Sequence, residues 1–199
     1  MSFLQKQTKF SIRYDDESGI LKLTAFLHSI IPRANVAYVV ICIGTDRSTG
    51  DSLGPLTGTL LKENSLQHLS VYGSLHEPVH ALNLHEYVDY IHHHYKNPYI
   101  IAVDASLGKR SSIGTIYSSN KALQPGSALK KNLPAIGHAH IVATVNLNSN
   151  LNYITLQNTR LSLVYDMAHR LAHSLYKLDL RLRQKEYTSR SSSDASKLI

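Results

Sequence analysis

The stretch AYVVICIGTDRSTGDSLGPL, residues 37–56, carries the strongest structural signal in the sequence. Residues 37–43 form a continuous apolar run rich in Val and Ile, which is typical of a strand that is buried on both faces of a sheet. A loop that contains glycines follows, and residues 53–62 then show the apolar spacing of a helix. The stretch therefore predicts a buried strand that passes through a loop into a helix, as in the repeating unit of a parallel sheet.

The same alternation of buried strands and amphipathic helices extends along the chain. The predicted strands are residues 37–43, 69–72, 99–105, 115–117 and 140–145. The predicted helices are residues 17–31, 53–62, 79–95 and 160–184. We therefore predict an α/β fold, a three-layer α/β/α sandwich around a twisted, mostly parallel sheet of about five strands.

Length and composition indicate a single domain. The chain has 199 residues, of which 43% are hydrophobic and 18% charged, which is the balance of a packed globular protein. We assign residues 1–187 to one α/β/α domain with an N-terminal helix, and residues 188–199 to a flexible Ser-rich tail. The one cysteine, Cys42, lies in the first apolar run, so we expect it in the core of a cytoplasmic protein and without an internal disulfide.

Charge and hydropathy exclude several classes of partner. The net charge of +7 comes without a stripe of Lys and Arg interleaved with aromatic residues, so no nucleic-acid partner is expected. No apolar run approaches the length of about 20 residues that crosses a bilayer, so no membrane partner is expected either. The acid-free stretch between Asp104 and Asp166 is interpreted as a solvated basic face, with docking of an anionic partner as the alternative.

The loop after the first strand contains the residues that we single out for function. A phosphate-binding loop would have Gly-Lys-Ser or Gly-Lys-Thr where this chain has Gly50-Asp51-Ser52, and a carboxylate at that position repels phosphate. The glycines also lack the spacing of a dinucleotide-binding fingerprint. Asp51 can be interpreted as a helix N-cap, where Asp is a favoured residue type, or as a reactive carboxylate.

A second carboxylate favours the reactive interpretation. Asp104 ends the apolar run YIIAVD, and an Asp in such a run has to be hydrogen-bonded, metal-bound or reactive. Both aspartates are expected at the carboxyl edge of the sheet, where open α/β sheets bind ligands. Two carboxylates there can share a proton and activate water, one as base and one as acid, or they can hold a divalent metal that does the same. Either mechanism requires both aspartates in one pocket that solvent reaches.

Further residues at this edge are predicted to bind substrate or to shape the loop. Glycines allow the backbone to approach a substrate closely, and a loop arginine can pair with an aspartate and lower its pKa. The full set is Gly44, Thr45, Asp46, Arg47, Gly50, Ser52, Gly54, His76 and Asn146. No cofactor and no metal are expected; if a divalent metal does bind, Asp51 and Asp104 are its expected ligands.

Four segments of the chain together resemble the YyaC-type sporulation proteins of Bacillus-like spore formers. They are CIGTDRSTGDSLGPLTGTLL (42–61), YGSLHEPVHALNL (72–84), IAVDASLG (101–108) and LQNTRLSLVYDMA (156–168). The resemblance spreads over most of the chain and implies a role in sporulation without defining a reaction.

A more distant resemblance, to the germination protease of spores, implies a reaction. Its motifs are matched here by Asp51-Ser52-Leu53-Gly54-Pro55, Val103-Asp104-Ala105 and Pro125-Gly126-Ser127. In that family two aspartates carry peptide hydrolysis, so the resemblance assigns catalysis to Asp51 and Asp104 and implies a hydrolase-like fold. The hydrogenase maturation proteases are similar in architecture, but no histidine of this chain matches the one with which they sense nickel.

The resulting hypothesis is a sporulation-associated peptidase that hydrolyses a peptide bond with the pair Asp51 and Asp104. Its expected partner is a protein or peptide made during sporulation, and the sequence leaves an oligomer open. Two alternatives also stay open. One is a non-catalytic binding or regulatory protein on a protease fold, and the other is a metal-assisted hydrolase that uses the same carboxylates.

Overall fold

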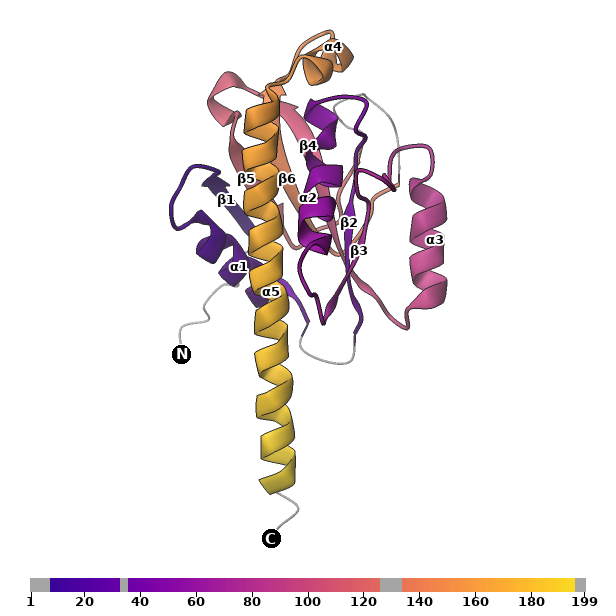
Figure 1. The fold of residues 1–199 in the computed structure, drawn as a ribbon, viewed down its shortest axis with the longest axis vertical. Helices are drawn as coiled ribbons and strands as arrows, with labels where there is room; N and C mark the ends of the chain where they lie inside the picture. Colours follow the sequence, from indigo (N-terminus) through magenta and orange to yellow (C-terminus); the bar gives the residue numbers. More distant parts are fainter. Residues whose placement is uncertain (1–7, 33–35, 126–133, 196–199) are drawn as a thin grey trace.

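The computed structural model describes residues 8–32, 36–125 and 134–195, and it folds them around one six-stranded sheet (Figure 1). The strands are β1 (Lys9–Arg13), β2 (Tyr38–Cys42), β3 (Leu69–Tyr72), β4 (Tyr99–Gly108), β5 (Thr115–Ser119) and β6 (Ala139–Leu147). The α-helices are α1 (Gly19–Ile30), α2 (Leu53–Lys62), α3 (Leu84–His94), α4 (Asn152–Gln157) and α5 (Leu161–Ala195). Two short 3-10 helices are η1 (Gly50–Ser52) and η2 (Arg110–Ser112).

The sheet is mixed and mostly parallel, in the order β1-β5-β6-β4-β2-β3. Strands β6, β4, β2 and β3 run parallel to one another, whereas β5 pairs antiparallel with both β6 and β1. The predicted fold class is confirmed, with one more strand than expected. The additional strand, β1, lies at the edge of the sheet and alternates exposed with half-buried residues. Its sequence, KFSIR, is too short and too polar to stand out as a strand.

Helices cover both faces of the sheet, as Figure 1 shows. Helices α1, α2 and α5 pack on one face, and α3 packs on the other. In β2, Val40 and Cys42 face the first core, whereas Val39 and Ile41 face the second. Because both faces are buried, the central strands are apolar at almost every position, which explains their continuous apolar runs. Cys42 lies in the core as predicted, and burial raises the pKa of its thiol to about 12.

Two helices differ in their bounds from the sequence prediction. Helix α3 begins at Leu84 and not at residue 79, because Val79 forms a parallel bridge with Ile43 and so extends the sheet. Helix α5 continues past the expected end to Ala195. The part of the predicted tail up to residue 195 is therefore helical, and residues 196–199 lie outside the described residues. No helix within the described ranges is both long and apolar enough to span a bilayer.

Two glycines bring α2 against the carboxyl ends of β2 and β3. A Cβ atom at Gly54 would lie 2.1 Å from the carbonyl oxygen of Ile43, and one at Gly58 would lie 1.8 Å from that of Gly73. Only glycine allows two backbones to approach so closely. The start of α2, and with it η1, is therefore fixed beside the end of β2.

Candidate functional site

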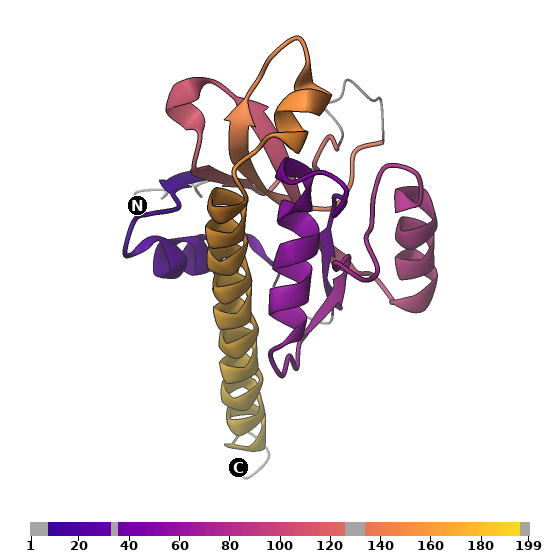
Figure 2. The ribbon, with the colours of Figure 1, turned by 45° about the horizontal axis from the view of Figure 1, so that its top comes forward.

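Strands β2 and β4 lie side by side at a switch point of the sheet. The chain leaves β2 through α2 toward β3 on one side, whereas it leaves β4 toward β5 on the other side. Such a point in an open α/β sheet is where ligands bind. Figure 2 shows the start of α2 and the short helix α4 at this edge of the sheet.

Asp104 lies in β4 at the place where the neighbouring β2 ends. The last pair between the two strands joins Cys42 to Val103, and the N–H of Ile43 then donates to the carbonyl oxygen of Val103 at 2.7 Å. Strand β4 does not end near Asp104, as the sequence predicted, but continues to Gly108, because β6 still pairs with it. Asp104 therefore lies just beyond the end of β2 on one side and still pairs with β6 on the other.

Backbone hydrogen bonds close the loop between β2 and η1. The N–H of Gly44 donates to the carbonyl oxygen of Val79 (2.8 Å), and the N–H of Thr45 donates to that of Asp51 (3.1 Å). Gly44 has a φ of 145°, and a Cβ there would lie 2.0 Å from the carbonyl oxygen of Asp51. Only glycine fits this position, and the closed loop places Asp51 next to the end of β2.

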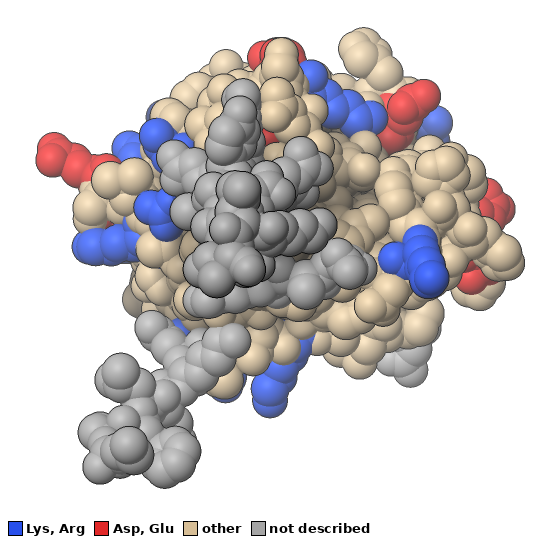
Figure 3. Space-filling model, turned by 90° about the horizontal axis from the view of Figure 1, so that it is seen from below, with Lys and Arg blue, Asp and Glu red and all other residues tan. Residues whose placement is uncertain are grey.

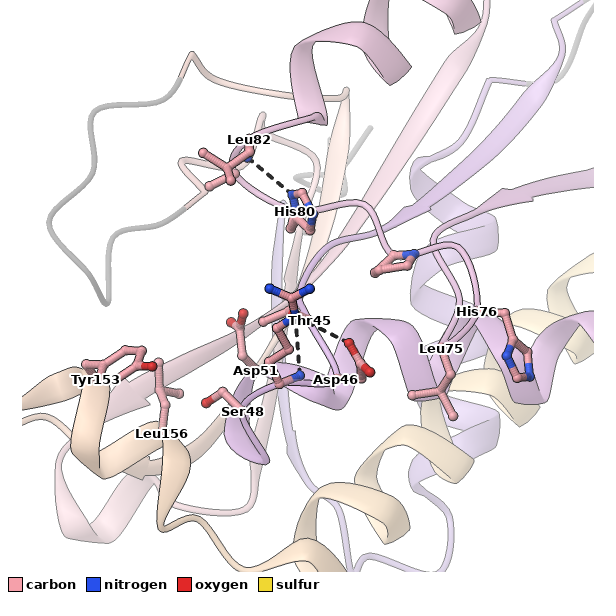
Figure 4. Close-up of a pocket in the computed structure, with 13 residues that line it drawn as sticks. Thr45, Asp46, Ser48, Asp51, Leu75, His76, His80, Leu82, Tyr153 and Leu156 are labelled. Atoms are coloured by element: carbon pink, nitrogen blue, oxygen red, sulfur yellow. Dashed lines mark hydrogen bonds between the residues drawn. The ribbon is translucent and has the colours of Figure 1, made fainter.

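A pocket of about 660 Å³ opens on this loop (Figure 4). Its walls come from the loop after β2, from the segment after β3 and from α4. Five of the residues predicted from the sequence line it, namely Thr45, Asp46, Arg47, Asp51 and His76. The other predicted residues are not among its lining residues, namely Gly44, Gly50, Ser52, Gly54, Asp104 and Asn146.

Asp51 and Asp104 interact, but only Asp51 lines the pocket. Asp104 is 8% exposed, and its Oδ1 accepts a hydrogen bond from the N–H of Ala105 at 2.8 Å. Burial and, second, the charge of Asp51 raise the pKa of Asp104 well above its usual range, although the hydrogen bond from Ala105 opposes this shift. The pair therefore combines a half-buried carboxyl at the pocket wall, Asp51, with a buried carboxyl, Asp104. The raised pKa keeps Asp104 protonated to a higher pH than an ordinary aspartate. Access of a substrate to Asp104 stays a prediction.

Asn146 and Gly50 support α4 and do not line the pocket. Asn146 lies within β6, and its Nδ2 donates to the carbonyl oxygen of Thr155 and to the hydroxyl of Thr159, both at 3.2 Å. A Cβ at Gly50 would lie 2.8 Å from Cδ2 of Leu156, so α4 packs directly on η1. The structure thus gives both residues a part in positioning one wall of the pocket.

Several lining residues were not predicted from the sequence. They are Ser48, Leu75, Pro78, His80, Ala81, Leu82, Tyr153 and Leu156. Helix α4 has six residues, which is too short for a helical period to show in the sequence. Its contact with the loop after β2 joins segments about a hundred residues apart, so only the fold reveals it. In the sequence, Ser48 lies three residues before Asp51, and His80 lies four residues after His76. This closeness to predicted site residues is the only sequence feature that could have pointed to them, because neither belongs to a known catalytic motif.

The carboxylate pair fits a resident metal poorly. Within residues 8–32, 36–125 and 134–195, no three His, Cys, Asp or Glu side chains group as metal ligands. Catalytic zinc takes three protein ligands, whereas Asp51 and Asp104 supply two carboxyls. We therefore assign no chemical step to a metal ion.

Comparison with known proteins confirms the resemblance seen in the sequence. The chain is 44% identical over 172 residues to "Uncharacterized protein YyaC" of Bacillus subtilis (strain 168), which covers 86% of this chain and 84% of that protein. Its fold is similar to the crystal structure of a [NiFe] hydrogenase maturation protease, HycI, from Thermococcus kodakarensis KOD1. That similarity has a TM-score of 0.52 and 16% identity, and it covers 76% of this chain and 97% of the other. The family described as "Protein of unknown function (DUF1256)" matches residues 11–174, and the chain belongs to this family.

Proposed function

We propose that the chain is a peptidase that hydrolyses a protein made during sporulation, with Asp51 as the base and Asp104 as its proton-holding partner. The observation that carries this proposal is the pairing at the switch point, where a carboxyl in the pocket wall raises the pKa of a buried carboxyl on the neighbouring strand. Two acids in such different environments divide the roles of base and acid between them. The maturation-protease fold supports peptide hydrolysis as the class of reaction. Sporulation as its context is carried only by the resemblance of the four sequence segments to sporulation proteins.

The different burial of the two carboxyls assigns their roles. Asp51 lines the pocket, so it is the carboxylate that meets a water molecule there and takes a proton from it. The water oxygen then bonds to the carbonyl carbon of the peptide. Asp104 keeps its proton to a higher pH than an ordinary aspartate, because burial and the charge of Asp51 raise its pKa. The proton held by the pair passes to the amide nitrogen as the carbon–nitrogen bond breaks.

The charge on the face opposite α4 gives no support for a nucleic-acid partner. Figure 3 looks onto the molecule from the end opposite α4, and the Lys and Arg side chains drawn there are scattered, with Asp and Glu among them. A nucleic-acid partner would favour clustered cations on one face. We place the reaction in the cytoplasm, where a buried and unpaired cysteine such as Cys42 stays reduced.

The test is cleavage of an extract of sporulating Bacillus subtilis cells by the purified protein, read as new peptide N-termini by mass spectrometry. The wild-type protein is expected to create new termini. Asp51→Asn is expected to create the same termini at least about 100-fold more slowly, because an amide cannot accept the proton of the attacking water. Asp166→Asn, at an exposed position of α5, is the matched control and is expected to cleave as the wild type does. Equal cleavage by the wild type and by Asp51→Asn would show that Asp51 is not the base.

A chelator arm separates this mechanism from the metal-assisted alternative. Cleavage is expected to continue in EDTA, because the proposal uses no metal ion. Loss of cleavage in EDTA, with recovery on addition of a divalent cation, would instead favour a metal held by Asp51 and Asp104.

One observation favours a second function, the non-catalytic binding of a partner. Asp104 is 8% exposed and does not line the pocket, so only one carboxyl of the pair, Asp51, lies where a bound partner would touch it. If the protein only binds, the same extract yields a partner that co-purifies intact with both the wild type and Asp51→Asn, and no new termini appear. The acid-free segment between Asp104 and Asp166 would then be the docking surface to map.

A further inference from the structure

A buried serine hydroxyl in the pocket has no hydrogen-bond partner among the residues that the structure describes. Ser48 is 8% exposed and lines the pocket, and its Oγ is buried without a partner. Figure 4 places Ser48 beside Asp51, with its hydroxyl turned toward Tyr153 and Leu156 of α4. Buried hydroxyls in folded proteins are nearly always hydrogen-bonded. An exception in the wall of a pocket indicates that a bound molecule supplies the partner.

Apolar side chains form much of the wall of this pocket. They are Leu75, Pro78, Ala81 and Leu82 from the segment after β3, and Tyr153 and Leu156 from α4. Leu82 is 87% exposed and Tyr153 is 60% exposed, although both side chains are large and mainly apolar. A concave site with apolar walls and a few polar groups is typical of ligand binding. The walls therefore suit a large apolar group, and the serine suits a hydrogen-bonding group.

The charged residues of the pocket narrow the class of ligand. Asp46 and Asp51 contribute two carboxylates, and Arg47 contributes one guanidinium, so their balance is negative and disfavours an acidic ligand. A peptide residue with a large apolar side chain supplies both the apolar group that suits the walls and the hydrogen-bonding group that suits Ser48. Its side chain covers the exposed Leu82 and Tyr153, and its backbone carbonyl accepts a hydrogen bond.

We propose that the pocket binds a peptide residue with a large, uncharged, apolar side chain, which lies between Leu82 and Tyr153 while Ser48 donates a hydrogen bond to its backbone carbonyl. This specificity rests on the proposed peptidase function, because it names the kind of residue that Asp51 meets beside the bond to be broken. The volume of about 660 Å³ accommodates such a residue together with its neighbouring peptide groups.

The structure requires little rearrangement for this contact. The hydroxyl of Ser48 now faces α4 (Figure 4), and rotation about the Cα–Cβ bond moves it between three staggered positions. No hydrogen bond has to break for this rotation, because the hydroxyl has no partner. Ser48 thus acts as a positioning residue for the peptide backbone and not as a nucleophile.

The test measures binding and is independent of hydrolysis. The probes are N-acetyl-phenylalanine methylamide, its alanine counterpart and its glutamate counterpart, titrated into ¹⁵N-labelled Asp104→Asn protein, which keeps both carboxylates of the pocket, and followed by NMR. The phenylalanine probe is expected to bind at least about tenfold more tightly than the alanine probe, since each fully buried methylene contributes about fourfold in affinity. The glutamate probe is expected to bind no better than the alanine probe.

Variants of the walls and of the serine separate the two contacts. Leu82→Ser and Tyr153→Ser are expected to remove most of the preference for phenylalanine, whereas Leu21→Ser, at an exposed leucine of α1, keeps it. Ser48→Ala is expected to weaken the phenylalanine and alanine probes alike, by about three- to tenfold, because it removes a contact to the backbone.

Ser119→Ala is the matched control for Ser48→Ala. Ser119 also has a buried hydroxyl without a partner, but it lies on β5 and outside the lining of this pocket. Neither variant is expected to lower the melting temperature, since each removes an unpaired buried polar group, and only Ser48→Ala is expected to weaken the probes. Equal affinity of the three probes, or unchanged affinity in Ser48→Ala, would overturn the proposal. Probe binding without cleavage in the extract would refute the peptidase function alone.

Discussion

Asp104 stands in β4 between Val103 and Ala105, where helices cover both faces of the sheet. Burial of a carboxylate without a compensating positive charge is costly, and here the charge of Asp51 makes ionisation of Asp104 harder still. An apolar residue at this position would serve packing better. A buried acid that faces a second acid is therefore expected at a functional site, where shifted pKa values cluster.

The raised pKa of Asp104 predicts a definite pH dependence of stability. Because the pKa is higher in the folded than in the unfolded chain, the wild type loses free energy of unfolding as the pH rises from the unfolded pKa of about 3.9 through the folded value. Asp104→Asn cannot ionise, so it is expected to gain stability relative to the wild type over that window and to keep this gain at higher pH. Urea denaturation of both proteins across the pH range measures the difference.

Asp166→Asn is the control for this experiment, because Asp166 is exposed on α5 and far from β4 in sequence. A difference between the wild type and Asp104→Asn that does not change with pH would contradict the assignment of a raised pKa to Asp104.

At the residue scale, the sequence identified both aspartates but not their surroundings. Asp51 and Asp104 stand out because each follows or interrupts an apolar strand, which is a local pattern. The surroundings of Asp104 depend on the pairing of β4 with β6, which continues beyond the end of β2. This register is a property of the whole sheet and cannot be read from one segment. Ser48 could not be recognised either, because an unpaired hydroxyl is defined by what surrounds it.

Helix α2 is the element that holds the candidate site in place. It follows η1 directly, and its glycines let it lie against backbone carbonyl oxygens at the ends of β2 and β3. A side chain on this face would push the helix away and displace Asp51 from the end of β2.

Gly58→Ala is therefore expected to destabilise the protein by about 3 kcal/mol or more, because its Cβ would lie 1.8 Å from the carbonyl oxygen of Gly73. Helix propensity alone would predict the opposite, a gain of about 1 kcal/mol for Ala over Gly. Gly19→Ala in α1 is the control, since a Cβ there has no contact closer than 3.6 Å. Thermal unfolding of the two variants decides between packing and propensity, and an unchanged Gly58→Ala protein would contradict the close approach of α2.

At the element scale, long apolar patterns were predicted well and irregular connections were not. The central strands and the helices α1, α2 and α5 follow from continuous or periodic apolar runs. The segment before α3 resembles a helix in pattern, but Val79 pairs with Ile43 in the sheet.

The contact of α5 with the start of β3 is also invisible in the sequence. There, the buried carboxylate of Asp179 accepts hydrogen bonds from the N–H groups of Gln67, His68 and Leu69, at 3.1, 2.8 and 2.8 Å.

At the scale of the whole molecule, the fold shows where a site lies but not which reaction occurs there. The chain shares its architecture with the HycI maturation protease at 16% identity, and a fold of this kind can carry different chemistries at the same edge of the sheet. The connections that leave β2 and β4 in opposite directions open the edge to a ligand. The proposed function therefore depends on the pair of acids that this particular chain places there.

The most direct test of this pairing is the titration of the Asp104 carboxyl itself, followed by the ¹³Cγ chemical shift in the wild type and in Asp51→Asn. We expect Asp104 to titrate well above the ordinary aspartate pKa of about 3.9 in the wild type, and at a lower pH in Asp51→Asn, because the like charge is gone. A wild-type midpoint in the ordinary range, or the same midpoint in both proteins, would contradict the pairing of Asp51 with Asp104.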